Sequence, residues 1–181
     1  MKKKILISTG GTGGHVIPAL NLYNHLKNSF DVSIYTDLRG SKYIPSEIKK
    51  TIFQVKKVSE TKYLFPIKVF FQFIAFVKSI NLLLRTKVDI IISTGGYMSL
   101  PIVLAAKIFK KKIILFEPNS IIGRSNKFLL RFSDKIFCYD RNVITSNNKI
   151  IINPVLNSCF YLNKNKSYFN NDKFRILIMG G

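Results

Sequence analysis

Acidic residues are scarce in this 181-residue chain: nine Asp and Glu stand against 29 Lys and Arg, which gives a formal net charge of +20. A surface this positive attracts anionic partners, and nucleic acid, anionic lipid and phosphorylated substrates all belong to that class. The composition does not choose among them. Lys, Asn and Ile are also what an AT-rich genome encodes, so base composition can account for part of the charge.

Cysteines and long apolar runs are scarce as well. Cys138 and Cys159 lie far apart and form no C-x-x-C or Cys/His ligand pattern, which argues against a zinc site or a disulfide framework. No stretch reaches the roughly 20 uninterrupted apolar residues that a transmembrane helix needs. The N-terminal lysines lead directly into a short apolar strand, without the longer apolar segment of a signal peptide. We therefore expect a cytoplasmic protein that lies on a membrane if it meets one.

Hydrophobic residues make up 47% of the chain, enough for one core of good size. Short β-prone runs alternate with longer segments of helical pattern, and most of these runs are apolar on both faces, as in a parallel sheet covered by helices on both sides. The predicted strands are 5–8, 32–36, 52–55, 88–93, 113–116 and 135–138. This pattern predicts an α/β fold with a Rossmann-like, doubly wound parallel sheet.

The C-terminal part of the chain differs in composition. Residues 163–173 are polar and lack periodicity, which is typical of a linker. Residues 174–179 are apolar and β-prone, and they lead into Gly180-Gly181, where a second strand-to-helix turn would begin. We therefore expect an N-terminal domain over 1–162, a linker over 163–173, and the first strand of a truncated second α/β domain over 174–181.

A glycine-rich turn follows the first predicted strand. It reads Thr9-Gly10-Gly11-Thr12-Gly13-Gly14-His15 and precedes a helix in which we expect Pro18 to occupy the first turn. Uncovered backbone N–H groups at the positive end of a helix dipole suit a phosphate. The spacing does not match G-x-G-x-x-G, because Val16 stands at the third glycine position, and no Walker lysine follows. A nicotinamide enzyme and a P-loop NTPase are thus disfavoured, and Asp37, after the second strand, is equally a ribose ligand or a turn cap.

Further motifs follow in a fixed order. Ser93-Thr94-Gly95-Gly96-Tyr97 comes after the fourth strand, Phe116-Glu117-Pro118-Asn119 after the fifth, then Asn126-Lys127, and Asn153-Pro154-Val155 before the linker. Together with the first glycine turn, they make the chain resemble the bacterial undecaprenyldiphospho-muramoylpentapeptide N-acetylglucosaminyltransferases of glycosyltransferase family 28. The chain departs from the family's usual residues at Phe116 (His), Pro118 (Gln) and Leu156 (Arg).

The resemblance implies the N-terminal, acceptor-binding half of a GT-B enzyme that works without a cofactor or metal, and the absence of an acidic D-x-D pair agrees with this. Such an enzyme transfers N-acetylglucosamine from UDP-N-acetylglucosamine, with inversion, to the muramyl 4-hydroxyl of undecaprenyl-linked lipid I, which gives lipid II. The resemblance also implies a peripheral protein on the anionic inner leaflet, at the cytoplasmic face of the bacterial inner membrane, with no nucleic acid partner. Because the missing half makes most donor contacts, we expect no useful turnover from this chain alone.

The resemblance also implies a set of site residues. The substrate-binding candidates are Thr12, Gly13, Gly14, Gly95, Gly96, Tyr97 and Asn119. The second glycine turn is either an anion site for the acceptor's diphosphate or only a tight turn. His15 either takes the proton of the acceptor hydroxyl, or caps the helix or binds phosphate without moving a proton. Glu117 competes for the role of general base, because a carboxylate at the carboxyl end of a strand points into the ligand crevice of such sheets.

Residues 66–85 form a basic amphipathic stretch. One broad helical face carries Val69, Phe70, Phe73, Phe76, Val77, Ile80, Leu83 and Leu84. That face alone is what an ordinary core helix shows. Phe71 and Leu82 fall among the lysines on the other side, which suits a helix that rests in the headgroup region of an anionic bilayer. The predicted membrane contacts are Phe70, Phe71, Ile74, Lys78 and Leu82.

Two other interpretations stay open at this point. A basic Rossmann-like module could bind membranes or RNA without catalysis, but RNA binding predicts cations interleaved with exposed aromatics along a groove, whereas the aromatics here gather in one helix. A split glycosyltransferase would take its donor domain from a separate polypeptide. A chain that stops within the Gly180-Gly181 motif favours truncation over a natural split.

Overall fold

A parallel seven-stranded sheet organises the chain, and the computed structural model describes residues 2–53, 65–119, 121–138 and 150–152 of it. The strand order is β3-β2-β1-β4-β5-β6-β7. The strands are β1 Lys4–Ser8, β2 Asp31–Asp37, β3 Lys50–Phe53, β4 Ile90–Ser93, β5 Lys112–Glu117, β6 Lys135–Cys138 and β7 Ile150–Ile152. The predicted fold class and the six strands predicted within residues 1–138 are confirmed, whereas β7 was not predicted. The linker, the last predicted strand, Cys159, the Asn153-Pro154-Val155 motif and Leu156 lie outside the described residues.

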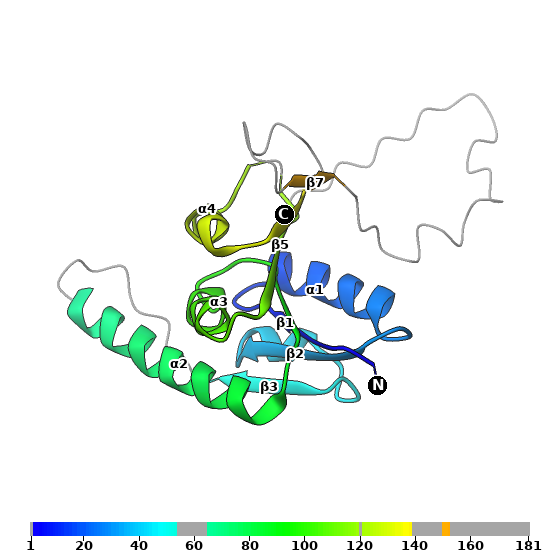
Figure 1. Cartoon of the computed structure of the whole chain (residues 1–181), viewed down its shortest axis with the longest axis horizontal. Helices are drawn as coiled ribbons and strands as arrows, with labels where there is room; N and C mark the ends of the chain where they lie inside the picture. The colour runs from blue at the N-terminus through cyan, green and yellow to red at the C-terminus, as the bar shows by residue number, and fades with distance from the viewer. Residues whose placement is uncertain (1, 54–64, 120, 139–149, 153–181) are drawn as a thin grey trace, which may run out of the picture.

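Helices cover both faces of the sheet (Figure 1). They are α1 Gly13–Leu26, α2 Phe65–Thr86, α3 Ser99–Ile108 and α4 Arg124–Leu129, with 3-10 turns η1 Gly40–Tyr43 and η3 Leu130–Phe132. Successive side chains of β1 point to opposite faces of the sheet, and each face has its own hydrophobic core. Ile5 and Ile7 pack with Ala19 of α1, whereas Leu6 packs in a second cluster with Leu83 of α2 and with several α3 residues.

The strand order reverses between β1 and β4, which makes this point the topological switch of the sheet. The chain passes from β1 to β2 and β3 in one direction and then places β4 on the other side of β1. The register pairs Ser8 with Ser93, so both strands end at the same level. In open α/β sheets, ligands bind at the carboxyl ends of strands that flank such a point. Both glycine turns follow these two strands, so the fold places them where a ligand site is expected.

Helix α1 begins at Gly13, about one turn earlier than predicted. Thr12 is the N-cap residue, with an extended backbone, and its carbonyl accepts hydrogen bonds from the amides of His15 and Val16 at 3.1 and 3.2 Å. The prediction that Pro18 lies in the first turn is therefore wrong, because the glycines themselves form that turn. Pro18 lies inside the helix and has no N–H to donate to the Gly14 carbonyl.

Helix α2 is rotated relative to the prediction. Among its described side chains, Ala75, Ser79 and Leu83 are buried, and the small side chains of the first two permit close contact with α3. Phe76, Ile80 and Leu82 are half-buried and pack against the same core. The placement of Leu82 on the solvent side was thus wrong. The apolar stripe is broader than the surface that α3 offers, so the small residues decide which part of it is covered.

The uncovered part of this stripe faces solvent. Phe70, Phe73, Val77 and Leu84 are 48–62% exposed, although their spacing had assigned them to the core face. Lys78 and Arg85 are exposed, while Phe71 and Ile74 are half-buried; the side chain of Val69 is not among those described. Helix α2 therefore carries an exposed apolar surface. It shares Phe70 with the predicted membrane contacts, but Phe73, Val77 and Leu84 take the places expected for Phe71, Ile74 and Leu82.

Candidate functional site

The two glycine turns touch each other backbone to backbone. Gly11, Gly95 and Gly96 have φ values of +88°, +91° and +85°, a region that glycine adopts without steric penalty. A Cβ on Gly10 would lie 2.8 Å from Cγ of Met98, and a Cβ on Gly96 would lie 3.4 Å from the Gly10 carbonyl oxygen. A Cβ on Gly10 would require Met98 to shift, and the positive φ of Gly11, Gly95 and Gly96 disfavours other residues there. The turns thus depend on glycine for space at Gly10 and for backbone conformation at the other three positions.

His15 lies between the two turns. Its Nδ1 is 2.9 Å from the carbonyl oxygen of Thr94. Because a carbonyl only accepts, we assign the proton of the neutral ring to Nδ1, which leaves Nε2 as the basic nitrogen. The ring covers the second turn, since a Cβ on Gly95 would lie 3.4 Å from Cε1 and one on Gly96 would lie 3.7 Å from Cδ2. The fold thus fixes both the tautomer and the position of this imidazole.

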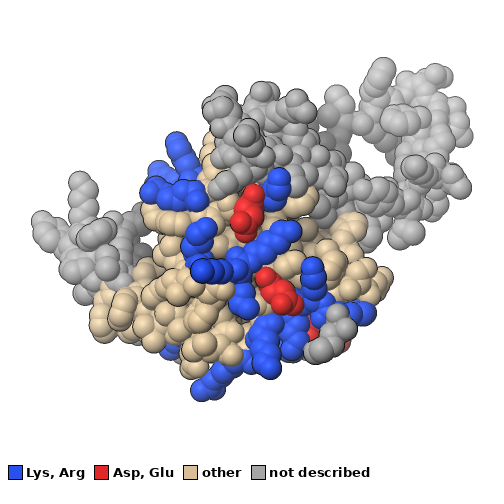
Figure 2. Space-filling model, in the orientation of Figure 1, with Lys and Arg blue, Asp and Glu red and all other residues tan. Residues whose placement is uncertain are grey.

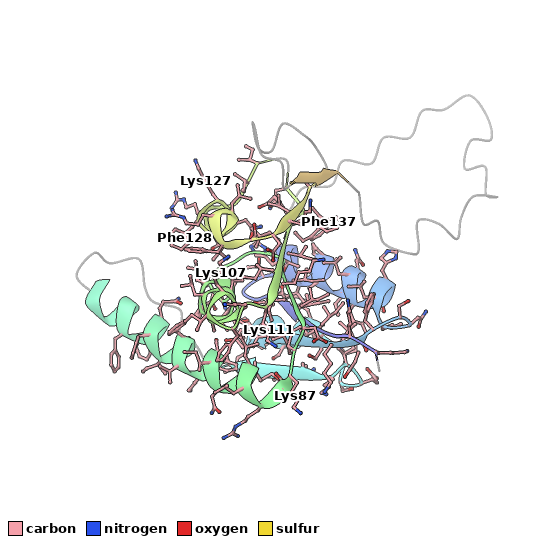
Figure 3. All side chains as sticks on the ribbon, in the orientation of Figure 1. Lys87, Lys107, Lys111, Lys127, Phe128 and Phe137 are labelled. Atoms are coloured by element: carbon pink, nitrogen blue, oxygen red, sulfur yellow. The ribbon has the colours of Figure 1, made fainter. Side chains whose placement is uncertain are left out.

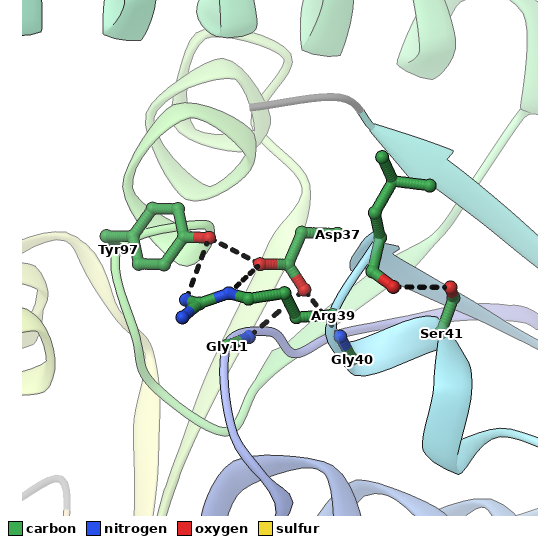
Figure 4. A network of polar contacts seen from close by, with 7 residues as sticks. Gly11, Asp37, Arg39, Gly40, Ser41 and Tyr97 are labelled. Atoms are coloured by element: carbon green, nitrogen blue, oxygen red, sulfur yellow. Dashed lines mark hydrogen bonds and ion pairs between the residues drawn. The ribbon is translucent and has the colours of Figure 1, made fainter. Parts of the chain in front are cut away.

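Asp37 joins the first glycine turn to Tyr97 (Figure 4). Its Oδ1 accepts hydrogen bonds from the backbone amides of Gly40 at 2.7 Å and Gly11 at 3.2 Å. Its Oδ2 accepts a hydrogen bond from the Tyr97 hydroxyl and lies 3.7 Å from Nε of Arg39. Of the two roles considered from the sequence, these contacts show that of a turn cap.

The protonation states in this cluster follow from the same contacts. Burial alone would raise the pKa of Asp37, but the hydrogen bonds from Tyr97, Gly40 and Gly11 and the charge of Arg39 together hold that pKa below its ordinary value. Burial and the hydrogen bond to Asp37 raise the pKa of Tyr97. At neutral pH the cluster therefore contains a carboxylate, a neutral phenol and a guanidinium.

Glu117 organises the turn between β5 and α4. Its side chain is buried, and its Oε1 accepts hydrogen bonds from Nδ2 and the amide of Asn119, at 2.8 and 3.2 Å. Its Oε2 accepts from the Gly123 amide at 2.8 Å and from Nδ2 of Asn126 at 3.0 Å. With four donors around it, the carboxylate has no open approach for an acceptor hydroxyl. The geometry therefore gives Glu117 a positioning role and disfavours it as the general base.

The structure gathers the predicted site residues at one edge of the sheet. Residues 12–15 follow β1, and residues 95–97 follow β4. Glu117 is the last residue of β5, the next strand, and Asn119 follows it. Asn126 reaches this edge too, because a Cβ on Gly95 would lie 3.3 Å from its Nδ2. No group of three or more His, Cys, Asp or Glu within the described ranges is placed to hold a metal ion. Arg39 was missed from the sequence, although its position just after β2, beside the switch point, is a usable signal.

Residues 5–138 match the model of the glycosyltransferase family 28 N-terminal domain, and the chain belongs to this family. It is 46% identical over its whole length to the UDP-N-acetylglucosamine--N-acetylmuramyl-(pentapeptide) pyrophosphoryl-undecaprenol N-acetylglucosamine transferase of Pelagibacter ubique (strain HTCC1062). It is 33% identical over 98% of its length to the protein of the same name from Caldicellulosiruptor saccharolyticus. The chain spans about half the length of these curated relatives, 52% of each.

Solved structures agree on the fold. The MurG structure from Acinetobacter baumannii matches with a TM-score of 0.72 at 23% identity, over 83% of this chain and 45% of that one. A UDP-GlcNAc 2-epimerase from Methanocaldococcus jannaschii matches with a TM-score of 0.60 at 14% identity, over 82% of this chain and 45% of that one. At these identities the likeness shows a shared Rossmann-like fold.

Proposed function

We propose that this chain is the acceptor-binding half of an inverting N-acetylglucosaminyltransferase that uses UDP-N-acetylglucosamine as donor and undecaprenyl-linked lipid I as acceptor. The observation that carries the proposal is the meeting of two glycine turns at the switch point, with His15 fixed between them. The relatives are named for this transfer. The acceptor domain spans 1–162, a linker spans 163–173, and residues 174–181 begin the donor domain.

In this mechanism, Nε2 of His15 takes the proton of the muramyl 4-hydroxyl as that oxygen attacks the anomeric carbon of the donor sugar. The new glycosidic bond forms on the face opposite to the departing UDP, which leaves with the electron pair of its own bond. The Thr94 carbonyl accepts the hydrogen bond from Nδ1–H of His15 and stabilises the imidazolium that forms. Asn119, in the turn after β5, is a further substrate-binding residue in this proposal.

Backbone groups supply the anion contacts. The amides of Thr12, Gly13 and Gly14 lie at the N-terminus of α1, where the helix dipole favours negative charge on UDP. The turn formed by Gly95, Gly96 and Tyr97 accommodates the diphosphate of the acceptor. Two turns that touch each other can thus hold two phosphorylated substrates with their reacting ends together.

Binding measurements on the 181-residue chain test this function. A short-chain prenyl diphosphate-linked muramoyl pentapeptide should bind, whereas a single-stranded RNA should compete only weakly for it at physiological salt. Tight RNA binding together with indifference to the acceptor would contradict the proposal and favour a non-catalytic basic module.

Transfer measurements test the role of His15. They require the donor half, which the remaining length of the Pelagibacter ubique relative can supply as a separate or fused chain. We expect His15→Gln to keep its affinity for the acceptor and to lose at least about a hundredfold in transfer rate, the usual contribution of a general base. Equal transfer by the native chain and His15→Gln would exclude this role.

We further infer that the outer face of α2 lies on the anionic inner leaflet, at the cytoplasmic face of the inner membrane. Phe70, Phe73, Val77 and Leu84 provide exposed apolar area, and Lys78 and Arg85 flank it. Among the described residues, no helix is long and apolar enough to cross a membrane. A lipid-linked acceptor must be met at the bilayer surface, which is why the proposed occupant of this face is lipid.

Cations on neighbouring elements support a membrane-facing side. Figure 2 shows Lys and Arg side chains spread over the face viewed, with few acidic ones between them. Lys107 projects from α3 and Lys127 from α4, beside Phe128, which is 42% exposed (Figure 3). Each such cation near an anionic surface contributes about 1 kcal/mol to membrane binding.

A further inference from the structure

Arg39 stands beside the first glycine turn with most of its donors uncommitted. Its side chain is 44% exposed. Within the part of the chain that the structure describes, its guanidinium makes one hydrogen bond, from Nη2 to the Tyr97 hydroxyl at 3.4 Å. Its Nε lies 3.7 Å from Oδ2 of Asp37, which is longer than a hydrogen bond. A guanidinium has five N–H donors, so this one retains capacity for a further acceptor.

The guanidinium faces the turn that the proposed site uses (Figure 4). A Cβ on Gly11 would lie 3.5 Å from Nη2 of Arg39 and 3.8 Å from the Tyr97 ring. The guanidinium carbon lies 6.0 Å from the centre of that ring. Arg39 is therefore held beside Gly11 by its hydrogen bond to Tyr97, its position near the Tyr97 ring and the charge of Asp37.

The directions of these hydrogen bonds leave Arg39 as the residue of this cluster that can donate a hydrogen bond to a ligand. Tyr97 gives its single hydroxyl proton to Asp37, and its oxygen accepts from Arg39. Toward the open side of the site the phenol can thus only accept. The carboxylate of Asp37 is buried and already receives three hydrogen bonds. An anionic ligand at this position would find one cationic donor, and that donor is Arg39.

We propose that Arg39 binds the diphosphate of the lipid-linked acceptor and that Asp37 and Tyr97 are the residues that position its guanidinium. The inference rests on the function proposed above. A guanidinium matches phosphate oxygens through paired N–H groups, which a lysine does not do. The diphosphate of the donor has the same chemistry, so the experiment must separate the two sources.

Four forms of the 181-residue chain make the test: the native chain, Arg39→Gln, Arg39→Lys and the control Lys42→Gln. Lys42 is exposed in the η1 turn that directly follows Arg39, so its substitution removes the same charge nearby. Each form is titrated with the short-chain prenyl diphosphate-linked muramoyl pentapeptide, with an alkyl glycoside of the same muramoyl pentapeptide that lacks both phosphates, and with UDP. Thermal unfolding of each form verifies that it is folded.

Arg39→Gln should weaken binding of the diphosphate acceptor by about tenfold or more, the usual size of a charge-assisted contact, and leave binding of the glycoside unchanged. Arg39→Lys should retain part of the affinity, and Lys42→Gln should stay within about twofold of the native chain. Equal losses for both acceptors, an equal loss in Lys42→Gln, or a loss confined to UDP would each overturn the assignment.

The positioning role has its own readout. Tyr97→Phe keeps the ring but removes the oxygen that accepts the hydrogen bond from Nη2 of Arg39. It should therefore weaken binding of the diphosphate acceptor by a few-fold. The double variant Tyr97→Phe/Arg39→Gln should bind no more weakly than Arg39→Gln alone, because both changes act on one contact. Additive losses would show that Tyr97 does not act through Arg39.

A failure of this inference is distinct from a failure of the proposed function. A native chain that binds neither acceptor refutes the function and the inference together. A native chain that binds the diphosphate acceptor, with Arg39→Gln binding it equally well, refutes the role of Arg39 alone.

Discussion

The carboxyl edge of the sheet and the outer face of α2 are built in opposite ways. At the edge, polar groups pair over long distances in the chain: His15 with Thr94, 79 residues apart, and Tyr97 with Asp37, 60 residues apart. On α2, the relevant side chains come from one helix and owe their common face to its 3.6-residue period. The structure of the sheet edge depends on individual hydrogen-bonding atoms, whereas the proposed membrane binding of α2 depends on its total exposed apolar area. Substitutions should therefore act abruptly at the edge and gradually on α2.

The largest effect is expected at Glu117. Glu117→Gln puts an amide N–H₂ where a carboxylate oxygen now accepts two hydrogen bonds, so buried donors face each other. We expect a loss of about 3 kcal/mol in the free energy of unfolding, measured by urea denaturation. Glu47→Gln, at an exposed position, serves as the control and should change little. A Glu117→Gln chain of native stability that had lost only transfer activity would instead identify a general base.

Gly95→Ala should act on the same edge through the backbone. The φ of +91° disfavours alanine, and the new methyl group would lie 3.4 Å from the His15 ring and 3.3 Å from Nδ2 of Asn126. A loss of about 2 kcal/mol in unfolding free energy is expected. Gly13→Ala is the matched control, because its Cβ would meet atoms only at 3.8 Å or beyond. Similar losses in both variants would show that the edge does not depend on glycine in the way described.

On the outer face of α2, the effect of a substitution on membrane binding should follow the apolar area that it removes. Phe73→Ser/Leu84→Ser removes two side chains that are 60% and 62% exposed, so it should leave the unfolding free energy within about 0.5 kcal/mol of native. It should also weaken sedimentation with phosphatidylglycerol-containing vesicles by about tenfold.

The pair predicted from the sequence gives the contrast. Phe71→Ser/Leu82→Ser should destabilise the fold, because Leu82 packs against the core. If this variant were stable and lost vesicle binding, while Phe73→Ser/Leu84→Ser kept it, the membrane-facing side of α2 would be the one first predicted.

The smallest effect is a pH dependence at Asp37. The pKa of this carboxyl is lower in the folded chain than in the unfolded one, so its stabilising contribution is complete above the unfolded value, about 3.9. That contribution is lost as the pH falls through the folded value. The difference in unfolding free energy between the native chain and Asp37→Asn should therefore be constant near neutral pH and shrink below about pH 4. A difference that did not change with pH would show that the Asp37 charge contributes nothing.

Local pattern predicted much of this molecule. The apolar runs located the first six strands because strands buried on both faces need continuous apolar residues, and Val, Ile and Leu supply them here. The short β7, Ile150–Ile152, was missed because three residues after a polar stretch are too few to form a pattern. The glycine turns were found because several glycines directly after a strand indicate a tight strand-to-helix turn.

By itself, the sequence determined the α/β class, the position of both glycine turns and the family, since each depends on neighbouring residues or on motifs kept in order. Only the tertiary structure decided which face of α2 is covered, because that depends on how closely Ala75 and Ser79 let α3 approach. It also decided that Glu117 positions a turn and that Arg39 lies over Gly11. Those roles are set by contacts between segments far apart in the chain, and no local pattern contains them.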